Sequence, residues 1–275
     1  MALVPFPSKA GKSASSDPDP DWDDDDDSSP DGAGKMSFLE HLDELRKRIV
    51  WALVGVVVGF AIAVFFYQEL WLFVMEPMQL LLGPGQKLIY TDPTEQLMLY
   101  VKICVIAGIL IASPLVMTQV WLFIAPGLYQ HEKKAAIPFV LMSSTFFVGG
   151  AAFAHYLVFP LTWRFLSSFS NDVVTFMPRV EPAFSLYMKL ILTFGVIFQM
   201  PTLVLFLAKL GLVTARFLIK NMKYAILIMF IVGAVLSPGT DPVGQIAMAG
   251  PMFLLYLFSI LLAWLFGKKR QPAEE

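Results

Sequence analysis

Acidic and basic side chains gather just before the first long apolar run of the chain. Residues 38–49 read FLEHLDELRKRI; their apolar members recur on one helical stripe, with Glu44 and Arg48 along another. We therefore expect an amphipathic helix that leads into the membrane at the level of the lipid headgroups. Asp43 with Lys47, and Glu44 with Arg48, stand four residues apart, which is the spacing of ordinary ion pairs on a helix. The pattern alone favours a structural lead-in over a binding site.

A second cluster of polar and aromatic residues follows the second apolar run. Residues 119–134 read QVWLFIAPGLYQHEKK, in which Trp121, Phe123 and Tyr129 suit a membrane interface and Glu132 precedes two lysines. A carboxylate near the headgroups, beside aromatic surface, can accept a planar guanidinium through two hydrogen bonds. A solvated loop glutamate is the commoner case, and only a partly desolvated pocket makes such a pair stronger than the ~0 to 1 kcal/mol of exposed ion pairs.

Further polar groups lie within or beside the apolar runs. Gln199 stands deep in the fourth run and is the best candidate for a hydrogen bond between helices; the carbonyl freed by the nearby Pro201 is its alternative partner. Lys102, His155 and Lys189 lie near the ends of runs. There we expect side chains that reach toward the headgroups, with a proton relay as the lesser alternative.

No combination of nucleophile, metal ligands or paired carboxylates supports a catalytic function. The sequence has no HExxH, GxSxG, Walker or GxGxxG pattern and no acidic pair placed in the middle of the membrane. Its one cysteine, Cys104, lies inside an apolar run, which excludes an intramolecular disulfide and favours a small buried side chain. We therefore expect no enzyme, no metal and no cofactor.

A membrane-embedded bundle must position these groups. Of the 275 residues, 57% are hydrophobic and 14% aromatic, and the mean hydropathy of +0.66 nearly excludes a soluble enzyme. About 20 apolar residues cross ~30 Å of hydrocarbon. A sixth run, Tyr224 to Leu236, reaches only about 20 Å, so on length alone it could be re-entrant. The five uncharged runs of full length are residues 49–67, 103–125, 135–154, 190–208 and 243–266.

The distribution of Lys and Arg decides how the sixth run is placed. Basic residues cluster before the first run and after the second, fourth and last, whereas the connections over residues 68–96 and 160–182 carry no such excess. Only six crossings with both termini in the cytoplasm satisfy the positive-inside rule at every loop. We therefore expect an all-α polytopic membrane protein, with six transmembrane helices in a kinked, concave bundle and a bilayer thinned at the short fifth helix.

Helix boundaries and bends also have sequence signals. Ser37 with Glu40 forms a capping box, and both Asp92-Pro93 and Asp241-Pro242 place a cap before a proline at the first helical position. Prolines within an apolar run remove a backbone hydrogen bond and should bend the helix. Four prolines lie there: Pro114, Pro138, Pro201 and Pro251.

The first 35 residues form an acidic leader with nine Asp and three Lys. We expect disorder, because this composition has too little apolar surface to offset the entropy of ordering. Transit peptides are rich in Arg and poor in acid, so the leader favours a bacterial plasma membrane over an organelle. The expected division is a leader over residues 1–35, a six-span domain over residues 36–270 and a short cytoplasmic tail over residues 271–275.

Three stretches together carry a family resemblance: HLDELRKR at residues 41–48, QVWLFIAPGLYQHEKK at 119–134 and Val158-Phe159-Pro160. With six spans and both ends inside, they resemble TatC, the multispanning subunit of the twin-arginine protein translocase, over about residues 36–267. The resemblance implies a receptor for signal peptides with paired arginines. It also implies small single-span partners of the TatA and TatB types, self-association in a multi-copy complex, and export of folded proteins driven by the proton-motive force.

The resemblance further implies roles for individual residues. Glu44 and Glu132 match the two cytoplasmic acidic residues that recognise the arginine pair, and neighbouring basic side chains would keep other cations away. The implied signal-peptide site comprises Glu44, Glu132, Phe123, Arg46, Arg48 and Gln119. The implied groove and partner-docking residues are Gln199, Pro77 in the first outer loop, Ser237, Asp241 and Gln245. Residues 237–245, SPGTDPVGQ, depart from the commoner two-proline form by an apparent one-residue insertion.

Two other function classes remain as alternatives. A proton-coupled small-solute transporter would use His155, Lys189 or Gln199 as a relay or as solute contacts. A membrane enzyme is the weaker alternative, because no activated nucleophile, metal cluster or carboxylate pair can be named for it.

Overall fold

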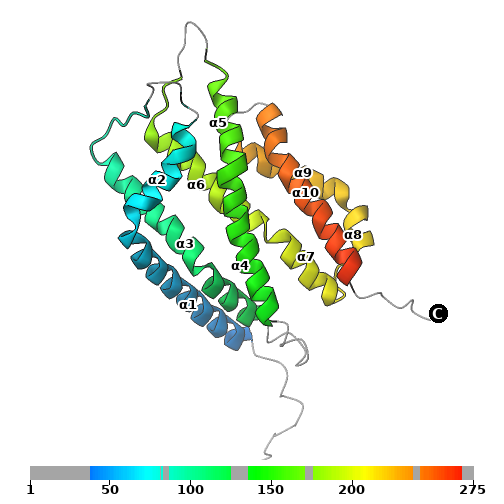
Figure 1. Ribbon diagram of the computed structural model, residues 1–275. Helices are drawn as coiled ribbons and strands as arrows, with labels where there is room; N and C mark the ends of the chain where they lie inside the picture. Colours follow the sequence, from blue (N-terminus) through cyan, green and yellow to red (C-terminus); the bar gives the residue numbers. More distant parts are fainter. Residues whose placement is uncertain are drawn as a thin grey trace, which may run out of the picture. The chain divides into compact units, whose positions relative to one another are not determined.

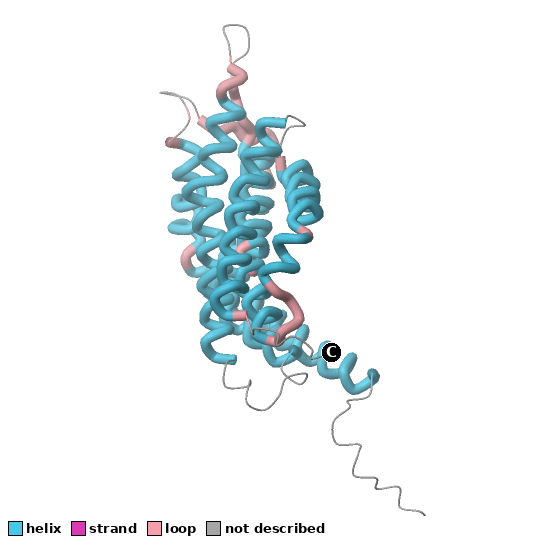
Figure 2. Tube along the Cα trace, turned by 90° about the vertical axis from the view of Figure 1, so that its right-hand side faces the viewer, coloured by secondary structure: helices cyan, strands magenta, loops and turns pink. Residues whose placement is uncertain are grey.

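The computed structural model describes residues 38–80, 82, 87–124, 136–170, 176–237 and 242–267, and these residues form helices joined by short connections (Figure 1). The tube in Figure 2 likewise shows helices and loops but no strand in the described parts. The acidic leader, the C-terminal tail, Glu132 and Asp241 lie outside the described residues. The expected all-α fold is confirmed for the part of the chain that the structure describes.

Five helical stretches are long and apolar enough to cross a membrane, as expected. They are His41–Phe65, Glu95–Ile124, Ile137–Ser167, Val180–Lys209 and Gly244–Phe266. The sixth run forms α9 (Met222–Leu236), which has 15 residues and is therefore only about 22 Å long. The lead-in is not a separate element, because α1 (Phe38–Phe65) runs through it into the first span without a break.

From Leu42 onward the chain forms one compact unit, in which small residues join α1 to α3 (Glu95–Ile124). Gly59 of α1 lies so close to Gly108 of α3 that a Cβ atom on Gly108 would stand 2.6 Å from the backbone nitrogen of Phe60. Ala63 and Cys104 are buried in the same contact, as expected for the cysteine. Without a hydrophobic driving force between helices in lipid, this close backbone approach lets dispersion forces hold the pair together.

The third crossing consists of three consecutive helical segments. α4 (Ala136–Phe153) continues through a π-helical turn (Ala154–Val158) into α5 (Phe159–Ser167). Pro138 lies in the first turn of α4, where the missing N–H has no partner to lose, so the expected bend at this proline is wrong. Pro114 and Pro251, by contrast, lie inside α3 and α10 (Pro242–Phe266).

The fourth crossing is interrupted where Pro201 predicted it. α6 (Val180–Ile197) ends before Phe198 and Gln199, and α7 (Met200–Lys209) starts with Pro201 near its N-terminus. α6 packs against α4, whereas α7 packs against α10. The break therefore lets the two halves of the fourth crossing pack against different helices. α10 also packs along α9, and its start at Pro242 agrees with the expected boundary.

Two short helices were not expected from the sequence. α2 (Tyr67–Gln79) occupies the connection after the first span and contains the buried Pro77, which we had expected in a loop. α8 (Ala215–Lys220) lies in the connection between α7 and α9, and Thr214 caps it by accepting a hydrogen bond from the Phe217 backbone. Both helices are shorter than a membrane crossing, so a search for long apolar runs does not find them.

Candidate functional site

The N-terminal part of α1 carries the first candidate carboxylate. Oε1 of Glu44 accepts a hydrogen bond from Nη2 of Arg48 at 3.0 Å, and the two side chains are only 18% and 30% exposed. The neighbouring pair of Asp43 and Lys47 is longer, 3.7 Å, and far more exposed. Oε2 of Glu44 and Nε of Arg48 are buried and have no hydrogen-bond partner among the described residues. Glu44 is thus partly desolvated, and its Oε2 could accept a further hydrogen bond.

The C-terminal part of α3 lies at the same end as this carboxylate. α1 and α3 are antiparallel, because Gly59 faces Gly108 while Gly55, earlier in α1, faces Leu115, later in α3 (Figure 1). Glu44 and Arg48 therefore share an end of the pair with Gln119 and Phe123, as the sequence predicted. Arg46 on the same turn of α1 is exposed, while Oε1 of Gln119 is buried without a described partner. The distance from Glu44 to Glu132 stays untested, because Glu132 lies outside the described residues.

Aromatic packing gives this end of α3 a rigid support. Trp121 stacks on Phe139 of α4 with ring centroids 5.1 Å apart, and Phe206 of α7 meets both rings edge-on. The Lys209 ammonium lies 5.1 Å from the centre of the Phe139 ring. Three crossings therefore meet at one aromatic cluster next to the polar residues of α3.

Gln199 makes the expected hydrogen bond between helices. Its Nε2 donates to the backbone oxygen of Ser143 in α4 at 2.9 Å. The alternative partner, a carbonyl freed by Pro201, is not the one that Gln199 uses. The amide lies at the break between α6 and α7, where the backbone itself has left regular helical geometry.

The residues expected to dock partners are partly engaged within the chain. Gln245 of α10 donates from Nε2 to the backbone oxygen of Phe230 in α9 at 2.8 Å. Ser237 follows the last residue of α9, and its hydroxyl is buried without a partner among the described residues. Pro77 is buried in α2, a separate part of the structure. The structure thus brings Gln245 to α9, whereas Asp241 lies outside the described residues.

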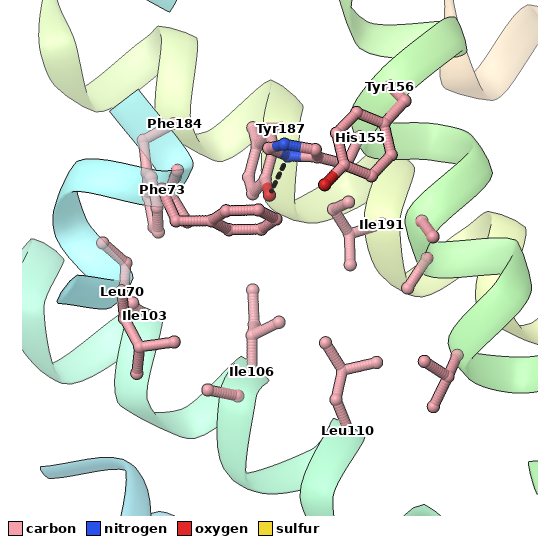
Figure 3. A pocket seen from close by; sticks show the side chains of 15 residues that line it. Leu70, Phe73, Ile103, Ile106, Leu110, His155, Tyr156, Phe184, Tyr187 and Ile191 are labelled. Carbon is pink, nitrogen blue, oxygen red and sulfur yellow. Dashed lines mark hydrogen bonds between the residues drawn. The ribbon is translucent and has the colours of Figure 1, made fainter. Parts of the chain in front are cut away.

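An apolar cavity of about 250 Å³ lies between α2, α3, the third crossing and α6 (Figure 3). His155 stacks on Phe73 with centroids 4.2 Å apart, and its Nδ1 is hydrogen-bonded to the hydroxyl of Tyr187 at 2.9 Å. His155 is only 4% exposed, so the expectation that it reaches toward the headgroups is wrong. The π-helical turn places this residue in the interior, where Tyr187 rather than water satisfies the ring.

The other end of α3 holds a carboxylate that sequence reasoning missed. Glu95 is buried and accepts hydrogen bonds from the backbone N–H groups of Glu181 at 2.8 Å and Thr91 at 3.2 Å. It therefore caps the start of α6, which has no cap of its own. Backbone bonds between Ile89 and the segment Pro178–Val180 join the same two connections.

The expected cap of α3 lies beside this contact. Asp92 accepts hydrogen bonds from the hydroxyl and the backbone N–H of Thr94, and these bonds lower the pKa of its carboxyl. Lys102 pairs with Glu181 at 3.2 Å, so its ammonium finds a carboxylate and not only the headgroups. No local pattern could predict the Glu95–Glu181 contact, because the two residues are 86 positions apart. The Gly55-x-x-x-Gly59 spacing, by contrast, was readable as a close helix contact.

The described residues contain no group of three or more His, Cys, Asp or Glu side chains that could hold a metal ion. Their arrangement suits binding instead. One end of the α1–α3 pair carries a partly desolvated carboxylate, and an apolar cavity lies between α2, α3, the third crossing and α6. These features can hold a cation and an apolar segment, respectively.

Comparison of the sequence with known proteins identifies the family to which the chain is similar. The family model described as Sec-independent protein translocase protein (TatC) matches residues 40–251. The chain is 40% identical to the TatC protein of Koribacter versatilis over 247 residues, covering 87% of this chain and 91% of that one. It is 42% identical to the TatC protein of Helicobacter pylori strain J99 over 223 residues, covering 81% and 87%.

Solved structures agree with the sequence matches. A crystal structure of the twin-arginine translocase receptor TatC superimposes with a TM-score of 0.72 at 38% identity, covering 82% of this chain and 98% of that one. A second, of the same receptor in DDM, gives a TM-score of 0.74. The expected resemblance and the expectation of a non-enzymatic protein-transport component are confirmed by these matches. By both sequence and structure, the chain belongs to the TatC family of Sec-independent protein translocase proteins.

Proposed function

We propose that this chain is the signal-peptide receptor and core membrane subunit of a twin-arginine translocase, which exports folded proteins with energy from the proton-motive force. The observation that carries the proposal is the hydrogen bonding of Glu44: Arg48 holds one carboxylate oxygen, and the other is buried without a hydrogen-bond partner among the described residues. The similarity to a solved twin-arginine translocase receptor supports the assignment.

The proposed recognition needs two carboxylates for two guanidinium groups. Glu44 offers Oε2 to one arginine of the signal peptide while Arg48 keeps Oε1 fixed, so the acceptor is oriented before binding. Glu132 receives the second arginine. Partial burial of Glu44 makes its charge-assisted bond stronger than an exposed ion pair. Exposed Arg46 and Lys47 repel cations that cannot make the paired contact.

The remaining parts of the proposal concern topology and partners. The chain crosses a bacterial plasma membrane six times with both termini in the cytoplasm, which puts Glu44 and Glu132 on the side where precursors are made. The apolar segment of the signal peptide follows the concave groove of the bundle. Small single-span subunits of the TatA and TatB types dock near Ser237 and Gln245, and several copies of the chain assemble together.

A crosslinking experiment tests the carboxylate. A twin-arginine precursor with a photoreactive group beside its arginines is added to membranes that contain the wild-type chain or Glu44→Gln. Loss of a hydrogen bond to a charged group, worth about 1.5 to 3 kcal/mol, should lower the affinity roughly 10- to 100-fold. The amide still offers an oxygen to Arg48, so the local helix should survive.

Asp43→Asn is the matched control, because it removes an adjacent charge that is exposed and loosely paired. It should crosslink like the wild type, and a precursor with lysines in place of the arginine pair should crosslink weakly to all variants. Undiminished, arginine-dependent crosslinking in the Glu44→Gln/Glu132→Gln double variant would contradict the receptor assignment. No specific observation supports the solute-transporter alternative.

A further inference from the structure

Lys189 is an exposed ammonium on a membrane-spanning helix. It lies nine residues after the start of α6, which is about 13 Å along the helix. Ser185, one turn earlier, is exposed on the same side, and Val196, two turns later, is 63% exposed. Along this strip of α6, the exposed side chains are polar at Ser185 and Lys189 and apolar at Val196, with the half-buried Thr193 between Lys189 and Val196. A lysine at such a depth needs acceptors for its N–H groups, because hydrocarbon supplies none.

One acceptor comes from the end of the short helix α9. Nζ of Lys189 donates to the backbone oxygen of Val235 at 3.2 Å. Val235 is the penultimate residue of α9, so its carbonyl is one of the groups that a helix end leaves unpaired, and the helix dipole favours a cation there. α9 is about 8 Å too short for ~30 Å of hydrocarbon. Because the proposed topology has α9 cross the membrane, we expect the polar boundary of the bilayer to dip at the place where Lys189 lies.

The charge of Lys189 is not balanced by any acidic side chain among the described residues. Another lysine near the start of α6 does have such a partner: among the described residues, Lys102 forms an ion pair with Glu181. Lys102 and Lys189 thus stand at the same end of the bundle and differ in one respect: the first has a carboxylate at 3.2 Å, and the second has a carbonyl. A carbonyl satisfies one N–H group but leaves the positive charge without a counterion.

We propose that Lys189, with Ser185 beside it, binds the phosphate of an anionic glycerophospholipid from the leaflet where α6 begins and α9 ends. The phosphate supplies the missing counterion and accepts the remaining N–H groups, and the lipid headgroup fills the dip that short α9 creates. Anionic lipid is the occupant that the position dictates, since the site faces the bilayer and is cationic. The site is separate from Glu44 and Arg48, so lipid binding to the purified chain does not depend on recognition of the signal peptide; it rests only on the proposed membrane crossing of α9 and lies beside Ser237 of the proposed docking region.

Native mass spectrometry of the purified chain tests the site with phosphatidylglycerol as the probe. After delipidation and titration with this lipid, the wild type should retain one tightly bound molecule. Lys189→Met should bind it at least tenfold more weakly, whereas Lys189→Arg keeps the charge and should bind within about threefold of the wild type. Lys102→Met is the matched control and should bind like the wild type, because it removes a lysine that already has a counterion.

Mapping of the bound lipid completes the test. A photoreactive phosphatidylglycerol should label peptides from the start of α6 and the end of α9 in the wild type but not in Lys189→Met. Equal retention by Lys189→Met and the wild type would overturn the proposal. So would loss of a copurifying protein partner with no change in bound lipid, which would identify a carboxylate of another chain as the counterion. Precursor crosslinking at Glu44 should be unchanged in every variant, so the two proposals fail independently.

Discussion

Gln199 joins the fourth crossing to the third through a single amide proton. Because its Nε2 donates to the Ser143 oxygen, the residue needs an N–H group rather than any polar atom. Gln199→Leu should leave the chain assembled in the membrane, at a cost of no more than about 2 kcal/mol, but should impair export. Gln199→Glu should donate only when the carboxyl is protonated. Export of a folded reporter and the thermal stability of the purified variants measure both effects, and normal export by Gln199→Leu would contradict a role in transport.

Tyr187 is the only described partner of the buried His155 ring nitrogen Nδ1 in a hydrogen bond. Tyr187→Phe keeps the aromatic packing but leaves that nitrogen unsatisfied in an apolar cavity, which should cost about 1 to 3 kcal/mol. Thermal unfolding in detergent measures the loss. Tyr156→Phe is the control, because its ring lies beside His155 but 69% exposed, and it should change the unfolding temperature little.

At the scale of elements, α1 and α3 approach each other closely because Gly59 and Gly108 have no side chains at their contact. A Cβ atom on Gly59 would collide with the backbone oxygen of Gly108, which cannot move away without shifting α3. Gly59→Ala should therefore destabilise the protein by about 1 to 3 kcal/mol, as overpacking does. Gly149→Ala is the control, since nothing lies within 4 Å of a Cβ atom there and alanine favours the helix. Equal stability of the two variants would show that α1 and α3 do not need this contact.

Glu95 fixes two connections that are far apart in the sequence. Glu95→Ala leaves the N–H groups of Glu181 and Thr91 without their acceptor, and we expect a loss of about 1.5 to 3 kcal/mol with faster hydrogen exchange in the first turn of α6. Glu95→Gln keeps one accepting oxygen and should lie between Ala and the wild type. Glu69→Ala removes an exposed carboxylate from α2 and should have no effect on this exchange.

Prediction from sequence succeeded where the signal is local. The start of α10 follows from Pro242, the start of α3 at Glu95 lies two residues after the expected Pro93, and the break before α7 follows from Pro201. Prediction failed where the position of a side chain depends on a residue far away in the sequence. His155 was expected at the headgroups because the sequence does not show that Tyr187 and Phe73 surround it. Of the candidate site, Glu44 and Gln119 lie at one end of the α1–α3 pair, and their role in binding stays a prediction. Glu95 depends on a contact that only the folded chain creates.

At the scale of the whole molecule, we expect the short helix α9 to set the local thickness of the membrane if it crosses as proposed. Four apolar residues inserted in its middle would lengthen it by about 6 Å and remove most of the mismatch. If a thin bilayer lowers the barrier to passage, this insertion should reduce export of a folded reporter while precursor crosslinking at Glu44 stays normal. Exchanging the neighbouring exposed residues Leu227 and Ile228 keeps the length and should leave export unchanged. Full export by the variant with the insertion would show that transport does not need the thinned bilayer.

The π-helical turn at Ala154–Val158 limits how this sequence can vary in length. Buried positions along the third crossing recur every four residues from Phe147 through Ala151 and His155 to Phe159 and Trp163. On a regular α-helix, such a stripe would drift by about 40° at each repeat. The wider turn takes up part of that drift, so both halves face the same neighbours. The wider turn absorbs about the 100° that one residue contributes to an α-helix. A one-residue deletion there should therefore restore ordinary winding and keep Phe159 and Trp163 in the interior, whereas a one-residue deletion within α4 should rotate them out.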